Sequence, residues 1–323
     1  MTRVRIDEIT FEIGRTRMRL DRREFVMTSI AGAVVGGSAL KALPQVQMGR
    51  WKTSRLIVGG NPISGNSHVS AELSREMANY FSAAAIKQLL RECESAGITT
   101  WQSRGDRHIM RLLNEYWLEG GRIQWIAQTA SELADIPRNI GDIARMEPAG
   151  IYHHGTQTDR FWLAGKIEQA RDMLKAIRQS GVLVGLGTHI PEVIDYVESK
   201  GWDLDFYMTC LYNLSRSKEE AEKLAGGSVS GELFWDPDRE KMLSRVRQTS
   251  KQCLIFKVYG AGRHCDSPAR MLAALRLAAS HAKPIDCFVI GMFPKYREQV
   301  KENCNLLVEA LQATEVQPGH DNH

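Results

Sequence analysis

The chain has 323 residues, of which 43% are hydrophobic and 25% charged, a composition typical of globular proteins with a large core. Residues 1–42 carry eight Arg or Lys and five Asp or Glu, so they supply +3 of the formal net charge of +4. The rest of the chain is near neutral and has no basic patch large enough to predict nucleic-acid binding.

Residues 1–42 resemble a twin-arginine export signal. Arg22 and Arg23 precede Phe25 and a weakly apolar run of small residues, with Met27 at a position where such signals often have Lys. The run is short and rich in Gly, so we expect no stable membrane span. We therefore expect export to the periplasm, with the twin-arginine export machinery as a partner. A basic amphipathic tail or a membrane anchor is the alternative.

Apolar runs that end in polar or Gly-rich corners predict eight β-strands. Continuous apolar strands are typical of a parallel sheet that is buried on both faces. The predicted strands cover residues 54–59, 98–102, 123–128, 150–152, 182–186, 204–210, 253–258 and 287–290.

Helical patterns separate these strands. Ser82 and Asp106 are predicted N-caps, and Pro191 and Pro237 stand where helices begin. Residues 63–81 are expected to form a loop, and an insertion over 214–235 is expected to be partly helical. Further helices are expected over residues 139–146, 163–179, 268–281 and 296–311.

The alternation of strands and helices predicts an α/β fold, a (β/α)8 TIM barrel over residues 48–313. Residues 314–323 are expected to be a disordered tail. The site of such a barrel lies at the C-terminal ends of its strands. The six cysteines show no CxxC spacing, and most lie in apolar patterns, which predicts buried free thiols.

Five segments, in chain order, carry a resemblance to a known family. They are SRLIVGGNPISG from Ser54, GIYHHGT from Gly150, VGLGTHIPEVID from Val184, FYMTCLYNLSR from Phe206 and VIGMFPKYREQVKEN from Val289. From about Met48 onward the chain resembles the aldo-keto reductase family. The resemblance implies hydride transfer between NADPH and a carbonyl, with a Tyr proton donor supported by Lys and Asp, and a His that orients the substrate oxygen.

The catalytic positions of that family transfer only in part. Gln102 stands at the family's Asp position, and no Tyr follows until Tyr116. The third strand ends at Gln128-Thr129, where the family has its Lys. Only the histidine has a counterpart, His154.

A replacement proton donor is possible on the seventh strand. Lys257 and Tyr259 would share a strand face, because side chains alternate along a strand. A structural lysine and a loop tyrosine are the alternative. Arg104 and Asp106 follow the second strand and join the candidates. The predicted catalytic residues are therefore His154, Lys257, Tyr259, Arg104 and Asp106.

The resemblance also implies positions for NADP(H). Thr188 falls within the segment that should anchor the nicotinamide, and Tyr212 could supply the stacking ring. The eighth strand is followed by residues that resemble the family's adenosine-phosphate and adenine segment. They are Lys295, Arg297, Glu302 and Asn303.

Four histidines follow different strands and could meet at the barrel mouth, namely His108, His154, His189 and His264. With Asp106 and Glu192 they could hold a metal ion or act as acid and base on a sugar. Their spacing is not that of a tight ligand set, so no metal ligand is assigned, although a metal is not excluded.

These patterns leave three functional hypotheses, each with a small-molecule ligand. The first is an aldo-keto-reductase-like oxidoreductase on a carbonyl or sugar-like substrate, with tightly bound NADP(H). The second is a non-redox lyase, epimerase or isomerase on a sugar-like substrate, which uses His and carboxylate groups at the barrel mouth. The third is a non-catalytic ligand-binding barrel.

Overall fold

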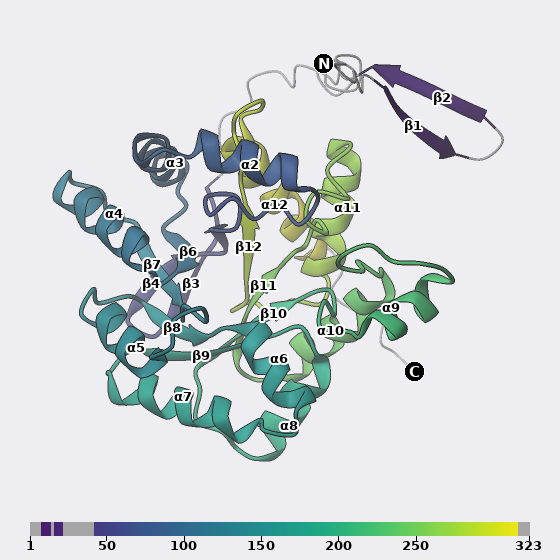
Figure 1. Ribbon diagram of the computed structural model, residues 1–323. Coiled ribbons are helices and arrows are strands. Elements are labelled where there is room, and N and C mark those ends of the chain that lie inside the picture. The colour runs from purple at the N-terminus through teal and green to yellow at the C-terminus, as the bar shows by residue number, and fades with distance from the viewer. Residues whose placement is uncertain (1–7, 14–15, 22–41, 316–323) are drawn as a thin grey trace, which may run out of the picture.

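The computed structural model describes residues 8–13, 16–21 and 42–315. Eight parallel strands close into a barrel in the order β10-β11-β12-β5-β6-β7-β8-β9, which confirms the predicted (β/α)8 fold (Figure 1). The strands are β5 (Leu56–Gly59), β6 (Thr100–Arg104), β7 (Gln124–Gln128), β8 (Gly150–His153), β9 (Leu183–Thr188), β10 (Phe206–Cys210), β11 (Gln252–Phe256) and β12 (Cys287–Gly291).

Helices surround the barrel and begin largely where the sequence predicts. Ser82 Oγ accepts a hydrogen bond from the Ala85 amide, and a carboxylate oxygen of Asp106 accepts one from Ile109, so both predicted N-caps are confirmed. The helices are α2 (Ala71–Tyr80), α3 (Ala83–Ser95), α4 (Arg107–Leu118), α5 (Ile136–Ala144), α6 (Gly155–Leu163), α7 (Glu168–Gln179), α8 (Pro191–Ser199), α9 (Lys218–Ala225), α10 (Pro237–Gln248), α11 (Pro268–Ala279) and α12 (Gln299–Glu315).

Two helices were not expected. The predicted loop over 63–81 contains α2, which begins at the Ser70 N-cap and buries only Met77. The segment before α7 contains α6, which starts directly after β8. Gly165, in the left-handed conformation, separates α6 from α7.

A hairpin of β3 (Gln45–Met48) and β4 (Trp51–Ser54) covers the N-terminal end of the barrel. Met48 is buried against the interior side chains of the barrel, among them Ile57 and Phe206. The Gln124 side chain, at the start of β7, donates a hydrogen bond to the carbonyl of Lys52 in β4. The barrel is therefore closed at this end, and its cavities open at the other.

A second hairpin, β1 (Glu8–Ile13) with β2 (Thr16–Asp21), forms a separate two-stranded sheet within the predicted signal segment. Arg22, Arg23 and the apolar run of the twin-arginine pattern lie outside the described residues, as do residues 316–323 of the predicted tail. Among the described residues, no helix is long and apolar enough to cross a membrane. Five of the six cysteines are buried free thiols, as predicted, and Cys265 is partly exposed.

Gly187 in β9 permits a close approach to the start of α6. A Cβ at this position would lie 2.9 Å from the Gly155 nitrogen and 3.0 Å from the His153 oxygen. Because these are backbone atoms of packed elements, we expect Gly187→Ala to lower the free energy of unfolding by about 1–3 kcal/mol. Urea unfolding followed by circular dichroism measures the loss.

Gly141→Ala is the matched control. A Cβ on Gly141, inside α5, would meet nothing within 4 Å. Alanine loses less conformational entropy than glycine when a helix forms, so the free energy of unfolding of this variant should rise by about 0.5–1 kcal/mol. Equal effects of the two substitutions would show that the contact between β9 and α6 is not tight.

Candidate functional site

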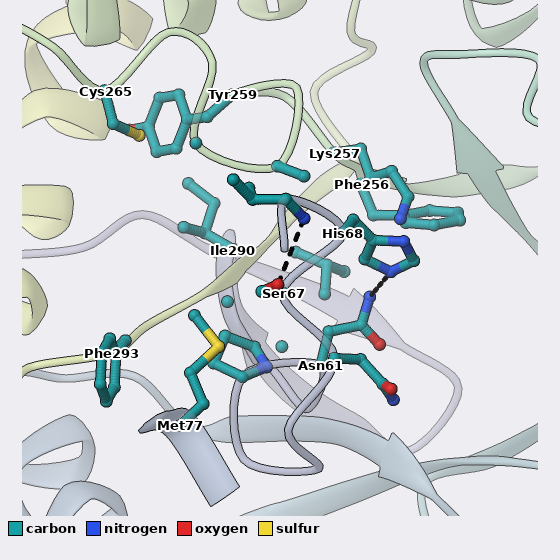
Figure 2. A pocket seen from close by; sticks show the side chains of 18 of the residues that line it. Asn61, Ser67, His68, Met77, Phe256, Lys257, Tyr259, Cys265, Ile290 and Phe293 are labelled. Carbon is teal, nitrogen blue, oxygen red and sulfur yellow. Dashed lines mark hydrogen bonds between the residues drawn. The ribbon is translucent and has the colours of Figure 1, made fainter. Parts of the chain in front are cut away.

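Two adjoining cavities lie at the C-terminal ends of the barrel strands. The first, the polar cavity, has a volume of about 310 Å³ and is lined by Arg104, Gln128, His154, His189 and other polar side chains. The second, the apolar cavity, has a volume of about 480 Å³ and lies between the ends of β5, β11 and β12 (Figure 2). The two share Asn61, Asn66, His68, Gln102, Phe256 and Lys257.

A hydrogen-bonded chain of three inward side chains lies at the polar cavity. Gln102 Nε2 donates to the Tyr152 hydroxyl at 2.8 Å, and this hydroxyl donates to Gln128 Oε1 at 2.7 Å. Burial raises the pKa of Tyr152 well above its ordinary value, so the phenol stays neutral and its proton stays on oxygen. Gln102 and Gln128 stand where the resemblance places Asp and Lys, and a tyrosine from β8 joins them. No sequence pattern indicated this role for Tyr152.

His154, at the start of α6, lines the polar cavity. Its Nδ1 lies 2.7 Å from Ser131 Oγ. Burial, reinforced by His189 and Arg104, lowers the pKa of His154 to about 4. The imidazole is therefore neutral at physiological pH and able to accept a proton from a ligand. Its predicted catalytic role stays a prediction.

Arg104 and Asp106 form an ion pair, but only Arg104 reaches a cavity. Arg104 lines the polar cavity and pairs with Glu132. Asp106 caps α4 and is not among the residues that line either cavity, although it lies 3.7 Å from Arg104 Nε. Its position favours a structural role.

The premise for pairing Lys257 with Tyr259 is wrong. Strand β11 ends at Phe256, and Lys257 has a left-handed backbone with φ of 59°, so strand alternation does not extend to Tyr259. The Tyr259 hydroxyl donates to Asn303 Oδ1 at 2.8 Å, and burial raises the pKa of the phenol well above its ordinary value. Lys257 lines both cavities, whereas Tyr259 lines only the apolar one.

The predicted adenosine-binding residues contact one another or the neighbouring helices. Lys295 Nζ donates to Glu76 Oε1 at 2.6 Å, and Arg297 pairs with Glu302. Asn303 accepts from Tyr259 and donates to the Gln299 carbonyl at 2.7 Å. None of the four predicted residues is among those that line the two cavities.

The predicted nicotinamide-binding residues are also engaged elsewhere. The hydroxyl of Thr188, a fully buried residue, donates to Asp159 Oδ1 at 2.6 Å. Tyr212 is buried, and its hydroxyl bonds to Asp236 at 3.2 Å and to His264 Nε2 at 2.9 Å. Neither residue lines either cavity. The side chains that the resemblance assigns to NADP(H) therefore do not fit that role in this structure.

Asp159 and His189 form a buried acid–imidazole pair that the sequence did not predict. Asp159 Oδ2 lies 2.6 Å from His189 Nδ1, and the Ser215 hydroxyl donates to the same oxygen at 2.7 Å. Burial disfavours the imidazolium, but the Cys210 sulfur and the Asp159 carboxylate outweigh it and raise the pKa of His189 to about 10. The pair places a cation at the wall of the polar cavity. Asp159 lies within α6, six residues after the end of β8, so the strand-end pattern did not point to it.

Three loops meet over the cavities. His68 Nδ1, from the loop before α2, lies 2.7 Å from Glu232 Oε2 in the insertion over 214–235. Arg263, after β11, donates to the His68 carbonyl at 3.2 Å, and its guanidinium lies 3.8 Å from the ring centre of Phe234. These contacts cover the mouth with side chains far apart in sequence.

The four histidines do not converge. His108 is exposed on α4, and His264 bonds to Tyr212, while His154 and His189 line the polar cavity. Within the described residues, no group of three or more His, Cys, Asp or Glu is arranged to hold a metal ion.

The neutral histidines make stability fall in acid. Burial lowers the pKa of His153 to about 3 and that of His154 to about 4, against about 6.5 in an unfolded chain. Between these values the unfolded state binds more protons, so the contribution of these two histidines to stability is complete above pH ~6.5 and is lost as the pH falls toward 4. We expect His154→Gln to flatten this acid limb in urea titrations at several pH values. His108→Gln, at an exposed position, should leave the limb unchanged, and a flattening there instead would contradict the assignment.

Comparisons with known proteins show which solved structures have a similar fold. No protein-family model and no curated protein matches the chain. A truncated 3-deoxy-D-arabino-heptulosonate 7-phosphate synthase from Thermotoga maritima is 12% identical, with 85% of this chain and 93% of that chain covered at a TM-score of 0.50. An aldo-keto reductase from Bacillus halodurans, in its holo form, is 14% identical, with 85% and 96% covered at 0.49. A 7,8-dihydropteroate synthase from Vibrio fischeri is 12% identical, with 86% and 100% covered at 0.48. Identities this low show the fold alone, and the chain is a (β/α)8 barrel with aldo-keto reductases and other barrel enzymes among its structural neighbours.

Proposed function

We propose that the protein is a non-redox enzyme that performs acid–base chemistry on a small polyhydroxylated carbonyl compound in the polar cavity. The reaction classes that fit are those of lyases, epimerases and isomerases. One observation carries the proposal: the acid, base and cationic side chains converge on the polar cavity, whereas all six predicted cofactor residues lie outside both cavities.

The polar cavity supplies the groups that such chemistry needs. His154 is neutral and serves as the general base that removes a proton next to the carbonyl. The imidazolium of His189 supplies positive charge for the oxygen on which negative charge develops. Amides such as Gln102 and Asn61 offer both donors and acceptors to hydroxyl groups.

A second candidate is an aldo-keto-reductase-like oxidoreductase with tightly bound NADP(H). The apolar cavity favours it, because that cavity adjoins the polar one and lies at the ends of β11 and β12, beside the segment that resembles the family's cofactor site. Any dinucleotide there would depend on residues other than those that the resemblance assigns.

Two measurements on the purified chain test the proposal. Fluorescence titration with NADPH should show no binding at millimolar cofactor, and no nicotinamide should co-purify. Incubation of the chain with ketose and aldose sugars in D2O should exchange carbon-bound protons for deuterium by NMR, and His154→Ala should abolish the exchange. Tight NADPH binding would favour the oxidoreductase, and failure of all sugars to exchange would count against an acid–base enzyme.

We also propose that the chain is exported through the twin-arginine machinery, on the pattern at Arg22, Arg23 and Phe25. Cell fractionation of the full chain should place it in the periplasm. Replacement of both arginines by lysine should retain it in the cytoplasm, and export of that variant would remove the basis of the proposal.

A further inference from the structure

Lys257 lies at the junction of the two cavities without a polar partner. It lines both cavities, and its ammonium forms no hydrogen bond or ion pair with any residue that the structure describes. The ring centre of Phe234 lies 5.8 Å from Nζ. Lys283, another partly buried lysine, differs, because it donates to Asp286 at 2.9 Å and to the Val246 carbonyl at 2.6 Å. The amine of Lys257 is thus left available to a ligand (Figure 2).

The backbone at Lys257 has an unusual conformation. Lys257 has φ of 59°, a left-handed conformation that non-glycine residues seldom adopt and that clusters at functional sites. Its carbonyl accepts a hydrogen bond from Gly260 at 2.8 Å, which closes the turn after β11. Gly260, Ala261 and Gly262 continue this turn with positive φ. The strained residue is therefore held by the turn that follows it.

The surroundings make the Lys257 amine easier to deprotonate than an exposed lysine. Burial lowers the pKa of Lys257, and the nearby Arg263 guanidinium adds to this effect, while the Cys210 sulfur and the Glu232 carboxylate oppose it. A neutral lysine amine in an apolar setting is a nucleophile toward carbonyl carbon.

We propose that Lys257 is a covalent nucleophile that condenses with the carbonyl carbon of the substrate to form a protonated imine. This inference rests on the proposed function, since it takes the carbonyl compound of the polar cavity as its substrate. The imine places a positive charge on the nitrogen bonded to the former carbonyl carbon, and the carbon beside that one loses a proton or a bonded carbon. It therefore stabilises the carbanion that a lyase, epimerase or isomerase must form.

Glu232 can carry the protons of this step. It lines the polar cavity and is held by His68 at 2.7 Å. The Lys257 ammonium gives one proton to Glu232, and its lone pair then bonds to the carbonyl carbon while a second proton moves from nitrogen to oxygen. Glu232 returns its proton to the resulting hydroxyl, the carbon–oxygen bond breaks, and water leaves as the C=N bond forms. An ammonium and a carbonyl thus become a protonated imine and water, and no oxidant or reductant is consumed.

Reductive trapping tests this assignment on the full chain. The protein is incubated with dihydroxyacetone and sodium cyanoborohydride at neutral pH, and the modified lysines are mapped by peptide mass spectrometry. We expect Lys257 to be labelled at least about tenfold faster than Lys218, whose side chain is 75% exposed. Lys257→Arg should lose only the fast label. Labelling of Lys257 no faster than that of Lys218 would overturn the proposal.

Two further readouts keep the outcomes separate. In the wild-type chain, half-maximal labelling of Lys257 should occur at a lower pH than half-maximal labelling of Lys218. This measurement needs only the wild-type chain, so it does not depend on whether Lys257→Arg folds. Coincident pH profiles contradict the proposal. Sugars that exchange carbon-bound protons in D2O without trapping at Lys257 would overturn the imine and leave the acid–base function standing. Absence of both exchange and trapping would overturn both.

Discussion

Asp159→Ala is expected to lower the free energy of unfolding by about 3–5 kcal/mol, because it removes one partner of a buried ion pair. Asp159 is fully buried, and it accepts hydrogen bonds from Thr188, His189 and Ser215. The substitution leaves all of these donors without their acceptor. Urea denaturation at pH 7 measures the loss. Asp172→Ala, which removes an exposed partner of Lys175, is the control and should change stability by less than about 0.5 kcal/mol.

The same pair makes stability depend on alkaline pH. The pKa of His189 is raised to about 10 in the folded state, against about 6.5 when unfolded. The folded state therefore binds more protons, so the stabilisation is complete below pH ~6.5 and is lost as the pH rises toward 10. The difference between the wild-type chain and Asp159→Asn should accordingly shrink over this range. A difference that stays constant with pH would show that His189 is neutral in the folded protein.

Asp238→Ala is expected to lower the free energy of unfolding by a similar amount, about 3–5 kcal/mol, because it removes the buried carboxylate that pairs with the buried Arg216 guanidinium. The side chains of Arg216 and Asp238 are 6% and 4% exposed, and Arg216 Nη1 donates to Asp238 Oδ2 at 2.6 Å. Asp238 also accepts from the Asn213 amide at 3.1 Å. The pair fastens the insertion over 214–235 to α10, so we expect the insertion to become more sensitive to proteolysis in this variant.

Two controls separate the buried pair from surface charge. Asp266→Ala breaks the ion pair with Arg270. The side chains of Asp266 and Arg270 are 56% and 54% exposed, so this variant should lower the free energy of unfolding by no more than about 0.5 kcal/mol. The double variant Asp238→Leu with Arg216→Met removes both buried charges and should recover much of the stability. A double variant as unstable as Asp238→Ala would show that the charges are individually needed.

The barrel could be predicted from the sequence because parallel strands buried on both faces leave uninterrupted apolar runs. Each of the eight predicted strands overlaps an observed one, and Pro191 and Pro237 begin the helices α8 and α10. Segments with weak patterns were missed. The helix α2 buries a single residue, Met77, and β3 and β4 are short strands that pair with each other rather than join the barrel.

The site could be predicted only in part. Strand ends meet at the barrel mouth, so their positions in the sequence pointed to His154, Arg104 and Lys257, all of which line the polar cavity. Asp159 and Glu232 reach the site from a helix and a long insertion, and their roles depend on three-dimensional proximity to His189 and His68. No local pattern records such proximity.

Residues assigned by resemblance met a different obstacle. Lys295 and Arg297 have the right type and order for a phosphate-binding segment, but Glu76 and Glu302 pair with them. The availability of a charged side chain to a ligand is set by its neighbours in space. A resemblance in sequence therefore transfers the position of such residues more safely than their role.

The six residues shared by the two cavities have a consequence for any pair of ligands. A molecule in the apolar cavity would contact Asn61, Gln102 and Lys257, and so would a molecule in the polar cavity. Their affinities are therefore thermodynamically linked, and each ligand must change the binding of the other by the same factor. Two ligands at the mouth of this barrel would therefore bind as one coupled unit with two compartments rather than at two independent sites.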